Sequence, residues 1–474
     1  MNFTKKTILL PAVLLSAFFC CSAGLAVSAA TTDTAETELT AANTFSDVEP
    51  DDWFYEDVTT LTGLGILNGY PDGLFHPERE ITTAEFIKVL LCTDPESTFE
   101  PIVPDSSPYS GHWASVYIAE ALHRGILTEN ELATGFDPDA PISRSDMTKM
   151  MIRALGIEPA RIDDPFSDIS DMYASTAYNE YLLRGYPTAD GSRTYNGSAS
   201  ALRSEAAAIA VRVIEYREDS YAYKRDAILS NAEENILTTE SELIDLFYIL
   251  NREFITEFTF ETPIPISIWQ QYYQHSNIIF VEYFYSSSVS INYVKGGTEY
   301  TIILQYDRDI DELKALHAKA DEKADAILDS IITDSMSDYD KVKAIHDYII
   351  LNCEYDFDNY LLGTIPSESR MSYGVLCEHK AVCQGYTAAF NLLCGKAGIR
   401  SIAIGGYAPN SSEDHSWNMV LIGGQIYYVD TTHDDPVPDR KGRTSYKYFY
   451  LTEAEMTSLG YAWDKTQSNI KYFY

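Results

Sequence analysis

The stretch KAVCQGYTAAFNLLCGKAGI, residues 380–399, places a cysteine where a helix is predicted to begin. Apolar or small side chains recur at helical intervals after Cys383, and Gly398 is suited to end the helix. Free amide groups at a helix start favour an anion, so the pKa of a thiol there is expected to fall. Cys394 lies about three turns further along the same face, too far for a disulfide with Cys383, and is interpreted as a buried apolar residue.

A second stretch, DHSWNMVLIGGQIYYVDTTHDDP at residues 414–436, predicts a β-hairpin. Gly423 and Gly424 separate two apolar runs, which is typical of a two-residue hairpin turn. The turn fixes the register, because it makes Ile422 the partner of Gln425. Every other pair along the two strands then follows by counting outward.

This register predicts the partners of the thiol. It sets His415 opposite Thr432 and Trp417 opposite Asp430. Because strand side chains alternate between faces, His415, Trp417 and Asp430 share one face, and His415 and Asp430 are diagonal neighbours within hydrogen-bond reach. A thiolate nucleophile needs a base and a residue that orients the base. We therefore predict that Cys383, His415 and Asp430 form a catalytic triad.

These two stretches, together with DYDKVKAIHDYIILNCEYD at residues 338–356, resemble the Cys, His and Asp blocks of the transglutaminase-like superfamily, in family order. The resemblance implies a papain-like α+β domain over residues 336–474. It implies Cys383 as nucleophile, His415 as general base and acid, and Asp430 as the residue that fixes the imidazole. The implied chemistry is acyl transfer from an amide through a thioester, which ends in a crosslink with an amine or in hydrolysis with water.

Two features depart from the family pattern. His433 stands where the last block usually has tryptophan. The sequence also has no secure counterpart of a side-chain oxyanion donor. The Cys383 backbone amide is a first candidate donor to the oxyanion, and Gln384 or Tyr373 is a candidate for the second. The HDDP run at residues 433–436 suits either a metal site or a structural turn, and we favour the turn. No metal or cofactor is expected.

Other readings of the same residues stay open. Cys383 alone could be a structural core cysteine. His379, four residues before it, is a rival base, and His346 either packs within its helix or takes part in catalysis. Cys353 and Cys377 could form a disulfide or stay free. The five cysteines that follow the N-terminal segment are too few and odd in number for a disulfide framework.

The N-terminal half contains an internal repeat. Three units are predicted, over residues 45–95, 100–158 and 162–216. Each indicates a helix led by aromatic residues, a turn rich in Gly, Pro and Asp, and a second helix. The acidic residues that open the units are Asp47, Asp105 and Asp168.

These units resemble S-layer homology domains, with the boxes TTAE, SRSD and LRSE at residues 82–85, 143–146 and 202–205. The resemblance implies an all-α three-repeat module that binds secondary cell-wall polysaccharide. Asp47, Asp105 and Asp168 would line its grooves, and Trp113 would offer a stacking face. Arg144 and Arg203 would meet the anionic sugar through paired hydrogen bonds, or would instead pair with acids of the protein itself. Thr83 stands where arginine is usual, so the first groove is expected to bind weakly, and Tyr173 replaces the tryptophan of the third unit.

The chain ends and composition bear on location. Residues 1–30 predict a cleavable signal peptide, followed by a linker over residues 31–44; a retained membrane anchor and a lipoprotein signal are the alternatives. No other apolar stretch is long enough to span a bilayer, so no transmembrane anchor is expected after cleavage. A net charge of −37 argues against a nucleic-acid partner.

Residues 217–335 predict an α+β lead-in region of the catalytic module. Helical runs flank strands within residues 277–306, with a hairpin at Gly296-Gly297.

The whole sequence predicts an exported enzyme held in the cell wall or S-layer, whose triad acts on amide bonds of a protein or peptide substrate at the surface. The alternatives are a non-catalytic surface scaffold or adhesin that retains the fold, and a surface-array component with the C-terminal domain as passenger.

Overall fold

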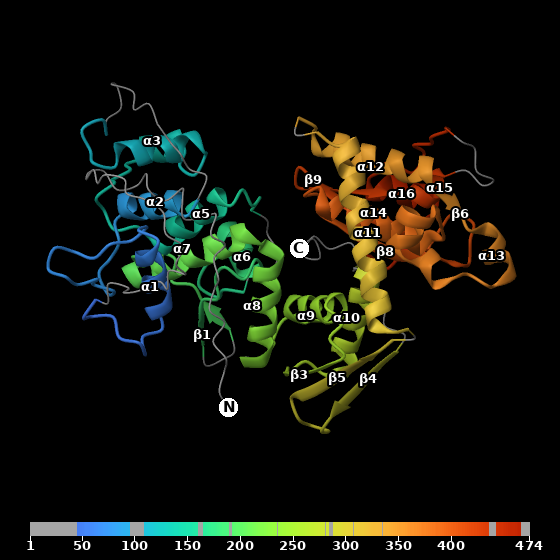
Figure 1. Cartoon of the computed structure of the whole chain (residues 1–474), viewed down its shortest axis with the longest axis horizontal. Helices are drawn as coiled ribbons and strands as arrows, with labels where there is room; N and C mark the ends of the chain where they lie inside the picture. The colour runs from blue at the N-terminus through green and yellow to red at the C-terminus, as the bar shows by residue number, and fades with distance from the viewer. Residues whose placement is uncertain are drawn as a thin grey trace, which may run out of the picture. The chain divides into compact units, whose positions relative to one another are not determined.

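The computed structural model describes residues 45–94, 109–159, 165–188, 192–234, 236–279, 281–283, 288–306, 308–333, 335–435 and 442–465. The predicted signal peptide and linker lie outside these residues. The chain divides into two compact units, Met1–Lys224 (unit 1) and Arg225–Tyr474 (unit 2), which carry the blue-to-green and the green-to-red elements of Figure 1. None of the described helices is both long and apolar enough to cross a membrane.

Unit 1 is built mainly from short helices. They are α1 (Tyr55–Gly63), α2 (Thr83–Cys92), α3 (Ser115–His123), α4 (Glu129–Ala133), α5 (Arg144–Ala154), α6 (Met172–Asn179), α7 (Arg203–Glu218) and α8 (Ser220–Glu234). The division between units 1 and 2 falls within α8. The expectation of an all-helical module is not confirmed, because β1 (Tyr186–Pro187) and β2 (Arg193–Thr194) form a short antiparallel pair. This pair lies in the turn between α6 and α7.

A ring of backbone hydrogen bonds joins the three repeats. The amide of Ile142 donates to Ile81, that of Ala201 to Ile142, and that of Ile81 to Ala201, at 2.9–3.0 Å. Each of these residues lies just before the box helix of its own unit, α2, α5 or α7. The helices follow the same cyclic order, since α3 packs on α2, α6 on α5 and α1 on α7. The third repeat therefore occupies a place equivalent to those of the other two repeats.

The sequence boxes form helix N-termini. Thr82 and Ser143 cap α2 and α5, because each hydroxyl accepts a hydrogen bond from the amide three residues later. Glu85 and Glu205 reach back to the amides at the start of their boxes, at 3.0 Å in both cases. The conserved spacing within each box thus serves helix capping.

Asp47 and Asp168 have equivalent roles in the first and third repeats. The Asp47 carboxylate accepts hydrogen bonds from the amides of Phe75 and His76, at 2.9 and 2.7 Å. Asp168 accepts from the amides of residues 195 and 196, both at 2.8 Å. His76 has a positive φ of 57°, so the carboxylate holds a loop conformation that most residues avoid.

Asp47→Ala is expected to loosen this loop. Two backbone amides would lose a charged acceptor, at a cost of about 1–3 kcal/mol. Hydrogen exchange at the amides of Phe75 and His76 should accelerate about tenfold or more. The control is Asp51→Ala, which alters an exposed acid and should leave the exchange of both amides unchanged. Equal effects of the two substitutions would contradict this role of Asp47.

Unit 2 begins with a helical and three-stranded region. Its elements are α9 (Glu240–Arg252), β3 (Glu257–Glu261), α10 (Ile266–Ile279), a 3-10 turn (Val281–Tyr283), β4 (Ser288–Tyr293), β5 (Glu299–Gln305) and α11 (Ile310–Ile331). The strands form an antiparallel sheet in the order β3-β5-β4. The predicted hairpin at Gly296 forms, with φ at 84°. The prediction of a strand from residue 277 is wrong, because residues 277–279 end α10, whose Trp269 and Tyr273 are buried.

The remainder of unit 2 encloses one helix between other helices and a sheet. Its elements are α12 (Asp338–Asn352), β6 (Glu354–Tyr355), α13 (Phe357–Leu362), η4 (Ser367–Arg370), η5 (Gly374–Glu378), β7 (Lys380–Ala381), α14 (Cys383–Lys396), β8 (Ser401–Tyr407), β9 (Asp414–Ile422), β10 (Gln425–Val429), α15 (Thr431–Asp434), α16 (Glu453–Leu459) and β11 (Ala462–Trp463). The antiparallel sheet has the order β10-β9-β8-β11. Helix α14 packs on β8 and β9 and also contacts α11 and α12.

Candidate active site

Cys383 is the first residue of α14, as the sequence predicts. Residues 385–394 of this helix are all buried, so the helix is fixed in the core of unit 2. A polar side chain holds it against β9: the side-chain Nδ2 of Asn418 donates to the carbonyl of Thr387 at 3.1 Å and to Asn391 Oδ1 at 2.8 Å. Asn418 is fully buried, so these bonds set the position of α14 strongly.

The predicted hairpin and its register are confirmed. Gln425 pairs with Ile422, and the pairing continues outward to Val429 and Asn418. Gly423 and Gly424 have φ values of 58° and 74°, which a tight turn of this kind requires. The turn therefore sets which side chains of β9 and β10 share a face.

His415 and Asp430 meet at the open end of the hairpin, where β9 begins and β10 ends. The distance from His415 Nε2 to Asp430 Oδ2 is 2.8 Å. The expected pairing of His415 with Thr432 is wrong, because β10 stops at Val429 and Thr432 belongs to α15. Asp430 keeps its place because it is the N-cap of α15, where its side chain accepts from the amide of His433.

Asp430 is fully buried, and both of its carboxylate oxygens accept hydrogen bonds. Its Oδ2 atom also accepts a hydrogen bond from the Tyr461 hydroxyl at 2.6 Å. The ring of His433 stacks on that of His415 with centroids 4.5 Å apart. Tyr461 and His433 thus hold the two sides of the carboxylate–imidazole pair.

Electrostatics favour a charged thiolate–imidazolium pair. Burial opposes ionisation of Cys383, but hydrogen bonding to His415, the imidazole charge and contacts to Ser416 hold the pKa of the thiol below its usual value. Burial also opposes protonation of His415, but Asp430 and then Cys383 raise the pKa of the imidazole to about 10. Asp430 uses Nε2, so Nδ1 is the ring nitrogen that remains for the thiol.

The nucleophile opens into a cleft of about 1010 Å³. Cys383, Gln384, His415, Ser416 and His433 line it together with residues of α13, η4 and the loop between β8 and β9. The backbone amide of Cys383 starts α14 and has no partner within the helix.

The structure places the rival residues elsewhere. His379 is exposed at a positive φ of 60° and does not line the cleft. His346 is fully buried between Asp347, at 3.1 Å, and Asp434, at 3.2 Å, which raise the pKa of its imidazole against the effect of burial. His346 is therefore a packing and charge-pairing residue of α12.

The cysteine alternatives are also resolved by position. Cys353 and Cys377 both carry free thiols, as do Cys383 and Cys394. Burial raises the pKa of Cys353 to about 12, so its thiol stays protonated at neutral pH. Cys394 is fully buried, in agreement with its interpretation as an apolar residue.

Among the described residues, the cluster that could hold a metal shares only His433 with the run at 433–436. Ligand atoms of His415, Asp430 and His433 lie within 4.8 Å of one another. These atoms already bond to each other and to Tyr461, so a metal would have to displace the contacts of the triad. In the 433–436 run, Asp434 pairs with His346, in keeping with a structural turn.

Two cleft residues were missed from the sequence. Tyr355, on the two-residue strand β6, lines the cleft, and its hydroxyl pKa is raised to about 12 by burial and then by the Cys383 charge. Arg370 ends η4 beside Gln384. Tyr373, a candidate oxyanion donor from the sequence, does not line the cleft. Neither β6 nor η4 has a periodic pattern long enough to place these side chains in advance.

The two arginines of the repeat boxes occupy equivalent places. Arg144 bonds to Glu205 and to the carbonyl of Tyr195, and Arg203 bonds to the carbonyls of Phe75 and Asn68 at 3.0 Å. Each arginine thus reaches from one box to the loop of the next unit in the ring. Both are at least nine-tenths buried.

The other residues of the module differ in exposure. Trp113 is 53% exposed, and Trp53, which the sequence analysis did not select, holds a similar place before α1 and is 64% exposed. Thr83, which stands at the place of Arg144 and Arg203, donates a hydrogen bond from its hydroxyl to the carbonyl of Ala140 at 3.2 Å. Asp105 lies outside the described residues.

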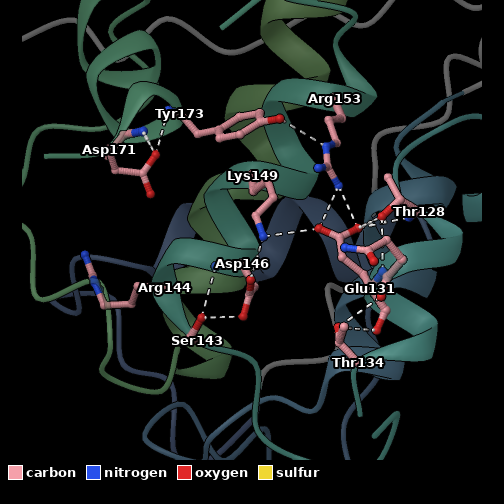
Figure 2. A network of polar contacts seen from close by, with 12 residues as sticks. Thr128, Glu131, Thr134, Ser143, Arg144, Asp146, Lys149, Arg153, Asp171 and Tyr173 are labelled. Carbon is pink, nitrogen blue, oxygen red and sulfur yellow. Dashed lines mark hydrogen bonds and ion pairs between the residues drawn. The ribbon is translucent and has the colours of Figure 1, made fainter. Parts of the chain in front are cut away.

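A charged network joins the second and third repeats of unit 1 at Tyr173. Figure 2 shows Glu131 facing Lys149 and Arg153, with Arg153 Nη1 at 3.0 and 2.9 Å from the two carboxylate oxygens. Burial opposes this charge, but these cations and Thr128 lower the pKa of Glu131 to about 2. Arg153 also reaches the hydroxyl of Tyr173 at 3.4 Å. Tyr173 thus serves contact between units.

Comparison with known families gives two matches. Residues 44–87 and 104–148 match the S-layer homology domain, and residues 325–431 match the transglutaminase-like superfamily. The chain therefore carries S-layer homology repeats followed by a C-terminal transglutaminase-like domain, and it is a secreted protein of the cell surface held at the cell wall. The assignment of the third repeat rests on its place in the hydrogen-bond ring.

Individual relatives match parts of the chain. Cell surface glycoprotein 1 of Acetivibrio thermocellus is 28% identical over 28% of this chain and 6% of that protein. S-layer protein sap of Bacillus anthracis is 26% identical over 28% of this chain and 16% of that protein. Kyphoscoliosis peptidase of Homo sapiens is 25% identical over 26% of this chain and 20% of that protein. The chain thus spans at most a fifth of the length of these three relatives.

One solved structure, described as the crystal structure of a TGase, covers 37% of this chain and 50% of its own, with 19% identity and a TM-score of 0.23.

Proposed function

We propose that unit 2 is an enzyme that transfers acyl groups from amides through a Cys383 thioester. The thiolate attacks the amide carbonyl, and the His415 imidazolium gives its proton to the leaving nitrogen, which departs as ammonia or an amine. His415 then takes a proton from water or from an amine acceptor as that molecule attacks the thioester. The thiolate and the imidazolium are restored, so the cycle balances.

One observation carries this proposal: Cys383, His415 and the buried Asp430 are linked in series at the floor of an open cleft. A scaffold that had lost catalysis would have no need to keep a thiol, an imidazole and a buried carboxylate in series at a cleft. Asp430 keeps the imidazole charged and oriented, as an orienting residue of a triad does.

The negative charge on the tetrahedral intermediate needs two donors. The Cys383 amide supplies one, at the positive end of the α14 dipole. We assign the second to the Tyr355 hydroxyl, because it lies in the cleft within the electrostatic range of Cys383. Gln384 remains the alternative, since it also lines the cleft.

The test uses the full chain beside Cys383→Ala, with a glutamine-bearing protein and a labelled amine. Amine incorporation, ammonia release and peptide cleavage are followed together. Incorporation or ammonia release by the wild type alone supports acyl transfer from glutamine, and cleavage alone moves the enzyme to the peptidases. Equal traces from the two proteins with glutamine donors and with wall peptides would favour the scaffold.

We further propose that unit 1 binds a secondary polysaccharide of the cell wall. Support comes from the family match and from the equivalent places of Arg144 and Arg203 in their repeats. The full chain should sediment with purified walls and stay in solution when the walls have been stripped of secondary polysaccharide. Binding that survives stripping would contradict this assignment.

A further inference from the structure

Arg370 is distinctive among the described residues that line the cleft. It is the only lysine or arginine there, it is exposed, and it belongs to a chain with a net charge of −37. Three carboxylates line the same cleft, those of Glu413, Asp414 and Asp464. A negatively charged substrate would therefore be repelled over much of the cleft and attracted at Arg370, away from the charge of the triad.

The guanidinium of Arg370 has no carboxylate partner among the described residues. Its Nη1 atom donates to Gln384 Oε1 at 2.7 Å, and this hydrogen bond holds the arginine side chain at the cleft lining. The nearby acid Glu368 forms an ion pair with Arg308 instead, with 2.7 Å between Glu368 Oε1 and Arg308 Nη1. A guanidinium can form two parallel charge-assisted bonds with a carboxylate, and the contact to Gln384 leaves most of its donors available.

Its position relates this cation to the nucleophile. Gln384, which holds Arg370, directly follows Cys383 in α14. Tyr355 lies within electrostatic range of both Cys383 and Arg370. A group bound to Arg370 would thus sit beside the bond that the thiolate attacks.

The geometry points to a substrate that carries a free carboxylate close to its reactive amide, with Arg370 binding that carboxylate. This inference rests on the proposed acyl transfer and names its substrate class. A donor whose carboxylate is blocked or absent would lose its contact with Arg370, the only lysine or arginine among the described residues that line the cleft. Arg370 is a specificity-determining residue in this scheme, and it fixes the direction in which the donor lies.

The test compares two alkylating reagents of similar size, iodoacetate and iodoacetamide, because only the first carries a carboxylate. The full chain is treated with each at pH 7, and the modification rate of Cys383 is followed by peptide mass spectrometry. Arg370→Gln should lower the iodoacetate-to-iodoacetamide rate ratio by about three- to tenfold, the range expected for one solvent-accessible charge contact. The decrease should shrink as salt is added.

Matched variants control for charge and fold. Arg443→Gln removes an exposed arginine that does not line the cleft and should leave the ratio unchanged, whereas Arg370→Lys should retain part of it. An unchanged ratio in Arg370→Gln, with Cys383 still reactive toward iodoacetamide, overturns the carboxylate inference and leaves the proposed enzyme standing. A Cys383 that resists both reagents overturns the proposed function, and this inference with it.

Discussion

His415→Ala is expected to lower amide-group transfer by roughly three to four orders of magnitude. The substitution removes the base, the proton donor and the positive charge that stabilises the thiolate. Only the contacts to Ser416 then oppose the effect of burial on Cys383, so the pKa of the thiol should rise. The measurement is kcat/KM for the donor identified by amine incorporation.

His379→Asn is the matched control for this loss. His379 is the nearest rival base along the sequence, but it is exposed and outside the cleft. Asparagine tolerates its positive φ of 60°, so the backbone should be kept. Near-wild-type kcat/KM is expected. A loss in His379→Asn as large as that in His415→Ala would mean that the base has been misassigned.

Gly385→Ala is expected to disable the enzyme through packing. Gly385 lies two residues after the nucleophile, and a Cβ there would sit 2.6 Å from the Ser369 carbonyl oxygen and 2.8 Å from the Ala381 Cβ. Neither is the end of a flexible side chain, so the start of α14 must shift. Such overpacking costs about 1–3 kcal/mol, and a shift near 1 Å can lower turnover about a hundredfold.

Gly395→Ala tests the same helix at its other end. A Cβ there meets no atom within 4 Å, and the residue is exposed. Alanine should therefore raise the free energy of unfolding of unit 2 by about 0.5–1 kcal/mol and leave turnover unchanged. Urea unfolding and kcat of both variants give the comparison. Similar behaviour at the two positions would contradict the packing argument.

The catalytic residues could be predicted because short-range rules place them. A Gly-Gly turn fixes the register of β9 and β10, and helical periodicity fixes the start of α14. The end of β10 could not be predicted, because it depends on Asp430 capping a four-residue helix. Tyr461 bonds to Asp430 from far along the chain, and such a contact leaves no local pattern.

The repeats show the same division. Their boxes and spacing indicate three equivalent units, and the hydrogen-bond ring among residues 81, 142 and 201 agrees with this. The burial of Arg144 and Arg203 could not be predicted, because it depends on loops contributed by another unit. Spacing within one unit carries no information about contacts between units.

The central claim is that His415 activates Cys383, and the pH dependence of alkylation tests it most directly. Iodoacetamide modification of each cysteine in the full chain is followed from pH 5 to pH 10, with buried Cys353 as an internal reference. Because the pKa of the Cys383 thiol is lowered, its rate should reach half of its maximum well below about pH 8.5, where an ordinary thiol ionises. Cys353, whose pKa is raised to about 12, should stay unmodified. A Cys383 that titrates at or above pH 8.5 would contradict the account.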